Sequence, residues 1–241
     1  MIDEYSRKLL SLAGKLIEKN EKSLEKAAEK LSFVIEGGGL INMFGCGHSH
    51  LIALDCFYRA GGLACIKPVL KPELMLHLSA SESSKLEKSE NSVKGLFDDA
   101  SLKKNDALVV ISTSGINGAP VEAAIEGKEK GAFVIGVGSS EYNDVKSRHS
   151  SHKRLKDVCD VFLDNLAPRG DALVNLTDTV KTGPSSTVLS SFIVQDLLVR
   201  AEKKCVSRGY VPHVFGSGNL KENADKNDAL VRLYKNRVKE L

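Results

Sequence analysis

Residues 107–118 read Ala-Leu-Val-Val-Ile-Ser-Thr-Ser-Gly-Ile-Asn-Gly, and this stretch decides the predicted fold. Its first five residues are apolar throughout, which is typical of a strand buried on both faces of a parallel sheet. Three hydroxyl residues and a glycine follow, and a helix then begins near Ala119 and Pro120, since proline is favoured in a first helical turn. The order of strand, polar loop and helix indicates one unit of an α/β fold.

The same alternation recurs on both sides of this stretch. Apolar runs predict strands at residues 40–44, 64–66, 107–111, 132–137 and 158–163. Helical patterns separate them at residues 50–60, 84–98, 119–130 and 151–157, and two more follow at 185–208 and 224–239. We therefore expect an α/β three-layer sandwich with a five-stranded parallel sheet in flavodoxin-like order, plus a long N-terminal helix and C-terminal helices. Such sheets bind ligands beyond the carboxyl ends of their strands.

The N-terminal segment predicts one amphipathic helix at residues 3–36. Apolar residues from Leu9 to Ile35 recur at three- and four-residue spacing, and a run of glycines at residues 37–39 ends the pattern. A helix of roughly 30 residues spans about 45 Å at 1.5 Å per residue, which is longer than one small domain covers. We therefore expect part of its apolar stripe to contact another subunit, in a homodimer or a dimer of dimers. The alternative is a helix folded wholly against its own domain.

The composition narrows the class of protein. The chain has 241 residues, a formal net charge of +3, 5% aromatic residues and no tryptophan, which argues against nucleic-acid binding. No apolar run approaches the roughly 18 residues that cross a bilayer, and the N-terminus lacks the pattern of a signal peptide. Five scattered cysteines without a Cys-x-x-Cys pair indicate reduced thiols. We expect a cytoplasmic protein that binds a small molecule, with no nucleic-acid or membrane partner.

Loops that follow the predicted strands favour phosphate binding. Residues 44–49, Phe-Gly-Cys-Gly-His-Ser, follow the first strand, and their glycines allow close approach of the backbone. A dinucleotide-binding loop would need a third glycine where His50 stands. The hydroxyls of residues 112–114 precede a helix N-terminus and can bind a phosphate monoester, although capping and turn formation are their alternative roles. A third hydroxyl cluster, Gly-Pro-Ser-Ser-Thr at residues 183–187, opens the next long helix.

These three motifs together resemble the sugar isomerase (SIS) domain family, over roughly residues 37–208. The family includes phosphoheptose isomerase and N-acetylmuramic acid 6-phosphate etherase, and the chain looks most similar to stand-alone bacterial SIS-domain proteins of about this length. The resemblance implies a sheet of five parallel strands, association into dimers or tetramers, and a phosphorylated sugar as ligand. By position, it implies that the residues which bind phosphate or sugar, or close the site over them, are Ser49, Ser112, Thr113, Ser114, Asn117, Ser186 and Thr187.

An aldose–ketose isomerase also needs a group that moves a proton between adjacent carbons and another that acts at the ring oxygen. Phosphoheptose isomerases carry a glutamate in the helix after the first loop, whereas this chain has Asp55 and Arg59 there. The remaining candidates are Glu82 and Glu87 for the carbon-bound proton, with His48 for ring opening. Their alternative roles are a solvated helix face for the glutamates and loop packing for the imidazole.

A metal is not expected at the first loop. Cys46, His48 and His50 alternate as zinc ligands can, but a fourth ligand is not evident. We therefore predict no metal and no cofactor.

The predicted function is to bind a phosphorylated sugar and isomerise it. The alternatives are a non-catalytic phosphosugar sensor or regulatory protein, and an etherase or lyase acting on an amino-sugar phosphate. The corresponding division of the chain is a dimerisation helix at residues 1–36, a SIS phosphosugar-binding domain at 37–208, and a C-terminal loop and helix at 209–241 that pack on the same domain.

Overall fold

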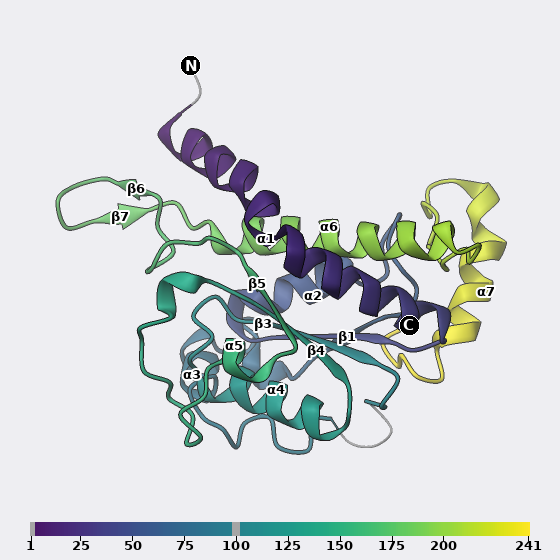
Figure 1. Cartoon of the computed structure of the whole chain (residues 1–241), viewed down its shortest axis with the longest axis horizontal. Helices are drawn as coiled ribbons and strands as arrows, with labels where there is room; N and C mark the ends of the chain where they lie inside the picture. The colour runs from purple at the N-terminus through teal and green to yellow at the C-terminus, as the bar shows by residue number, and fades with distance from the viewer. Residues whose placement is uncertain (1–2, 98–101) are drawn as a thin grey trace.

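The computed structural model describes residues 3–97 and 102–241 and contains a five-stranded parallel sheet of order β2-β1-β3-β4-β5 (Figure 1). This is the predicted architecture. The strands are β1 Ile41–Gly45, β2 Ile66–Val69, β3 Ala107–Ile111, β4 Phe133–Gly138 and β5 Val161–Asp164. The expected second strand at residues 64–66 and fifth strand at 158–163 are therefore displaced toward the C-terminus.

Helices cover both faces of the sheet because side chains alternate along each strand. In β3, Val109 and Ile111 pack into a core shared with α1, α2 and α6, whereas Leu108 and Val110 pack toward α4 and α5. Figure 1 shows α1 and α6 crossing one face and α3, α4 and α5 on the other. The helices are α1 Glu4–Glu36, α2 His50–Cys56, α3 Ala80–Leu86, α4 Gly118–Glu129, α5 Leu155–Val158, α6 Ser186–Ser207 and α7 Ala224–Tyr234.

The long helix α1 packs against its own chain over most of its length. From Leu16 onward its apolar stripe is buried, and Leu16, Leu24 and Leu31 are fully enclosed in the core with α6. Its first turns project beyond the sheet (Figure 1), and Leu10 there is 61% exposed. Only this first part of the predicted stripe is left for another subunit.

An asparagine of α1 binds the edge strand of the sheet. The buried carboxamide of Asn20 donates from Nδ2 to the carbonyl oxygens of Asp164 and Leu16, both at 2.8 Å. Its Oδ1 accepts from the Asp164 N–H, also at 2.8 Å. Asp164 ends the edge strand β5, so these bonds set where α1 sits along that strand.

Several local expectations were wrong. The helix expected at 84–98 is instead α3 at 80–86, because the Ser79 hydroxyl accepts from the Glu82 N–H and begins the helix earlier. Residues 87–97 form turns, and residue 98 lies outside the described residues. The helix α2 ends before Phe57 rather than at residue 60, α5 and α7 are shorter than expected, and a small hairpin, β6 Val174–Asn175 with β7 Lys181–Thr182, was not anticipated. Within the described ranges, no helix is long and apolar enough to cross a membrane.

Candidate functional site

A cavity of about 550 Å³ lies beyond the carboxyl ends of β1 and β3, where a parallel sheet is expected to bind ligands. The loop after β1, the helix α3, the loop after β3 and the N-terminus of α6 all contribute to its wall. The residues predicted from sequence that line it are His48, Ser49, Glu87, Ser112, Thr113, Ser114, Ser186 and Thr187.

The hydroxyl loop after β3 keeps hydrogen-bond donors available. The Ser112 hydroxyl oxygen accepts from the Gly115 N–H at 3.2 Å, and the Thr113 hydroxyl oxygen accepts from Asn165 Nδ2 at 3.5 Å. Each hydroxyl that accepts from the protein still has its own hydrogen to donate. Gly115 has a φ of +60°, which closes the turn and suits glycine. This end of the cavity therefore suits an anion.

Another part of the cavity wall, at Asp171 and Ser186, has the reverse character. Asp171 accepts at one carboxylate oxygen from the N–H and hydroxyl of Ser185 and from the Ser186 N–H, at 2.7 to 3.0 Å. Its other oxygen accepts from the Ser186 hydroxyl at 2.6 Å. Because the Ser186 hydrogen is donated to a carboxylate, the hydroxyl faces the cavity as an acceptor. This wall suits ligand groups that donate, such as sugar hydroxyls.

Asp171 and Tyr142 line the cavity but were missed in the sequence. Tyr142 accepts from the Gly170 N–H at 3.0 Å through its hydroxyl, and so connects the loops after β4 and β5. Both residues follow strands that the sequence predicts, and that position is the signal that could have selected them.

Glu87 is held in the cavity wall by neighbours on two other segments. Asn117 Nδ2 donates to Glu87 Oε1 at 2.6 Å, and the Arg148 guanidinium donates to Asn117 Oδ1. The Ala119 N–H donates to the Glu87 carbonyl oxygen at 3.0 Å, and a Cβ on Gly118 would lie 2.7 Å from the Lys88 carbonyl oxygen. The start of α4 therefore packs closely on the turn that carries Glu87.

This arrangement separates two predicted residues from the cavity wall. Asn117, expected beside the phosphate, is 8% exposed and lies between Glu87 and Arg148. Glu82 is on an exposed face of α3 and pairs with Lys85 at 2.7 Å. Neither residue lines the cavity.

The first loop brings His48 to the cavity, and the cluster of potential metal ligands found among the described residues does not include Cys46, His48 or His50. His50 Nδ1 is hydrogen-bonded to the Gly47 carbonyl oxygen. Burial raises the pKa of the Cys46 thiol well above its usual value, and the charge of Glu87 adds to this.

The helix after the first loop offers no carboxylate to the cavity. Asp55 accepts from Ser191 at 2.8 Å and from Gln195 at 3.0 Å, and pairs with Arg59. Burial alone would raise the pKa of Asp55, but the hydrogen bonds from Gln195 and Ser191 and the charge of Arg59 lower it below its usual value. Asp55 therefore connects α2 to α6 as an ionised group.

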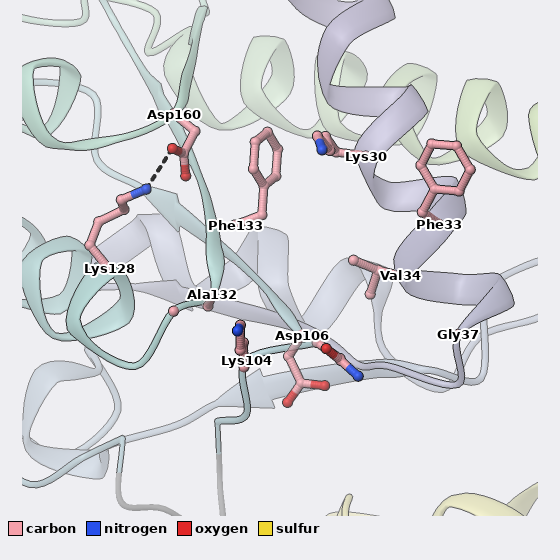
Figure 2. Close-up of a pocket in the computed structure, with 12 residues that line it drawn as sticks. Lys30, Phe33, Val34, Gly37, Lys104, Asp106, Lys128, Ala132, Phe133 and Asp160 are labelled. Atoms are coloured by element: carbon pink, nitrogen blue, oxygen red, sulfur yellow. Dashed lines mark hydrogen bonds and ion pairs between the residues drawn. The ribbon is translucent and has the colours of Figure 1, made fainter.

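A second cavity, of about 490 Å³, lies at the amino ends of the strands (Figure 2). Lys128 there pairs with Asp160 at 2.5 Å. Asp106 accepts from the Leu40 N–H at 2.8 Å and from Arg237 at 2.6 Å. These charged groups already have partners that serve the fold, so the cavity beyond β1 and β3 is the stronger candidate.

Comparisons with known proteins agree with this fold. The family model described as "SIS domain" matches residues 4–139. The "UPF0309 protein BH0227" of Halalkalibacterium halodurans is 43% identical over 240 residues, covering 99% of this chain and 96% of that protein. The "UPF0309 protein Teth39_1980" of Thermoanaerobacter pseudethanolicus is 38% identical over 247 residues, and the alignment covers 100% of this chain and 100% of that protein. A phosphoheptose isomerase from Francisella tularensis superposes with a TM-score of 0.50 at 15% identity, covering 83% of this chain and 95% of that one, which is a likeness of fold.

Proposed function

The chain belongs to the UPF0309 family of SIS-domain proteins, and from that premise we propose that its cavity binds a phosphorylated sugar and catalyses aldose–ketose isomerisation. One observation carries the proposal. The hydroxyl loop at Ser112–Ser114 and the carboxylate of Glu87 line the same cavity, although they come from different segments of the chain.

The distribution of donors and acceptors supports one orientation of the ligand. Phosphate would bind at Ser112–Ser114, where hydroxyl hydrogens are available. It would avoid Asp171, because two negative groups at close range repel each other. The sugar hydroxyls would extend toward Asp171 and Ser186, which accept hydrogen bonds.

The proposed chemistry uses Glu87 as the group that carries the proton. In the open-chain sugar, its carboxylate would remove the proton from C2 and return it to C1, while the O2 hydroxyl proton passes to O1. His48 would deliver a proton to the ring oxygen in the preceding ring opening, while the anomeric hydroxyl would release its proton to water. The Asn117 amide would hold the Glu87 carboxylate in place, and Arg148 would fix which way that amide points. Each positioned acid or base contributes about 10²–10⁴ in rate.

The second candidate is a phosphosugar sensor without catalysis. It is favoured by α2, whose carboxylate Asp55 is bound by Ser191 and Gln195 and is absent from the cavity lining. Incubation of the protein with phosphorylated hexoses, hexosamines and heptoses in deuterated water separates the two functions. An isomerase exchanges the C2 proton for deuterium, whereas a sensor binds the same sugar without exchange.

Replacing Ser114 with Ala is expected to weaken phosphosugar binding by about 1.5–3 kcal/mol, the value of a hydrogen bond to a charged group. This corresponds to about a 10- to 150-fold rise in Kd, measured by titration calorimetry. Ser186→Ala is the matched control, and it should leave the affinity for inorganic phosphate nearly unchanged. Equal affinity of the wild-type protein for phosphorylated and free sugar would contradict phosphate recognition by this loop.

The exposed start of α1 leads us to propose that the protein is a homodimer, or a dimer of dimers, joined through these turns. Leu10→Asp is then expected to lower the mass measured by light scattering to that of a monomer, because a carboxylate would be buried in the contact. Leu220→Asp, at a leucine 50% exposed near the C-terminus, should leave the mass unchanged. A wild-type protein that is monomeric at micromolar concentration would overturn this proposal.

A further inference from the structure

A cluster outside the cavity brings a histidine and two glutamates together from three segments. Glu90 lies in the turns after α3, Glu122 in the second turn of α4, and His149 in the loop before α5. One potential ligand atom from each lies within 4.8 Å of the others. None of these residues lines the candidate cavity.

The imidazole is the buried centre of this cluster. His149 is 5% exposed, and its Nε2 lies 2.5 Å from Glu122 Oε2 and 3.7 Å from Glu90 Oε2. The two carboxylates are 26% and 31% exposed, so water reaches their outer side. The same ring nitrogen therefore faces both carboxylates at a site open to solvent.

The cluster places two carboxylates against one imidazole. Among the residues described, the ion pairs recorded for Glu90 and Glu122 are both with His149. The hydroxyl and N–H of Ser150 donate to Glu90 at 2.7 and 2.6 Å. Two carboxylates and one imidazole that converge in this way are ligands that a divalent cation accepts.

We propose that Glu90, Glu122 and His149 bind a divalent transition-metal ion of the zinc type. Nitrogen and carboxylate ligands at about 2.0–2.2 Å suit zinc, and tetrahedral ligand atoms are then about 3.4 Å apart. The Glu122 contact would have to widen to reach that separation, while the Glu90 contact is already close to it. Water would occupy the fourth position on the exposed side.

Outer hydrogen bonds of the kind that orient metal ligands are also present. His149 Nδ1 accepts from the Ser151 N–H at 3.1 Å and lies 2.8 Å from the Ser151 hydroxyl, which could accept a hydrogen from Nδ1 in the other tautomer. Binding through Nε2 selects the form in which Nδ1 carries the hydrogen and donates to that hydroxyl. Ser150 orients the Glu90 carboxylate in the same way.

A bound ion would connect the segments that position Glu87. Glu90 is three residues from Glu87, and His149 follows Arg148, whose guanidinium holds Asn117. The ion would thus fix these segments relative to the start of α4. The binding site itself does not depend on the proposed reaction, and its test needs no sugar.

Titration calorimetry of the whole chain with Zn²⁺, after dialysis against a chelator, tests the site. The wild-type protein is expected to bind one ion per chain. Glu122→Gln and Glu90→Gln are each expected to weaken Zn²⁺ binding at least about 100-fold. Loss of a group that only orients a metal ligand costs about 10- to 100-fold, so a loss of this size indicates that the glutamate is itself a ligand. Both changes keep the side-chain shape, and circular dichroism checks that the variants fold.

The matched control is Glu126→Gln, one turn further along α4. It should bind Zn²⁺ as the wild-type protein does. Zn²⁺ should also raise the Tm of the wild-type and Glu126→Gln proteins but not that of Glu122→Gln, since an ion that binds only the folded state stabilises it. Absence of Zn²⁺ binding by the wild-type protein, or wild-type affinity in the Glu90→Gln and Glu122→Gln variants, would overturn the proposal.

Discussion

Replacing Glu87 with Gln is expected to reduce the turnover of a phosphorylated sugar at least 100-fold and to leave its binding nearly unchanged. Gln keeps the shape of the side chain, and its carbonyl oxygen can still accept from Asn117 Nδ2. It cannot take a proton from carbon near neutral pH. A group that acts in the transition state lowers kcat when it is removed, with little effect on Kd.

The matched control is Glu82→Gln, which lies on α3 just before the turn that carries Glu87 but pairs with Lys85 at the surface. It should retain wild-type turnover, because Glu82 does not line the cavity. The variant should also fold normally, because an exposed ion pair contributes little to stability. Turnover and binding are measured on the same preparations by proton exchange at C2 and by calorimetry. Wild-type turnover in the Glu87 variant would exclude Glu87 as the base, and the sugar-binding test at Ser114 would be unaffected by that result.

Replacing Leu24 with Ala in the middle of α1 is expected to lower the free energy of unfolding by about 2–5 kcal/mol. Leu24 is fully buried between the sheet and α6, so the change leaves a cavity that its neighbours fill only in part. Urea denaturation measures the loss. Leu10→Ala, at the 61% exposed position on the same helix, should change the free energy of unfolding by less than about 0.5 kcal/mol in the monomer.

The same reasoning predicts that a chain starting at Glu36 will not fold. Removing α1 exposes the core residues that Leu16, Leu24 and Leu31 cover. A soluble, folded monomer from such a chain would show that α1 is an accessory of the domain and not part of its core. For this reason the subunit contact is tested better by Leu10→Asp than by deletion.

The sheet was predictable because its strands are apolar on both sides. Ala107–Ile111 is buried at every position, and Pro120 marks the start of α4. The helix α3 was misplaced because the polar run around it has no clear period, and the boundary depends on the Ser79 cap. The hairpin of β6 and β7 is short and mostly exposed, so it has no apolar alternation to detect.

The site residues that directly follow strands were predictable from the sequence. The residues whose positions depend on contacts with distant segments of the chain were not. Ser112–Ser114 could be selected from their position after β3. Glu82 and Glu87 could not be distinguished, because only the packing of α4 on the turn after α3 shows which of them faces the cavity. The position of Asn117 likewise depends on Arg148, which is 31 residues away.

The contact between Asn20 and Asp164 also bears on how the protein avoids aggregation. An edge strand with free N–H and C=O groups is a template on which another chain can add a strand. Asn20 occupies both groups of Asp164 at the end of β5, and Lys26 of the same helix donates to the Asp160 carbonyl oxygen at 3.0 Å just before that strand. The helix α1 thereby blocks the place that a sixth strand would take. A chain that lost α1 would expose the edge of β5, and this edge could pair with the same edge of another copy of the chain.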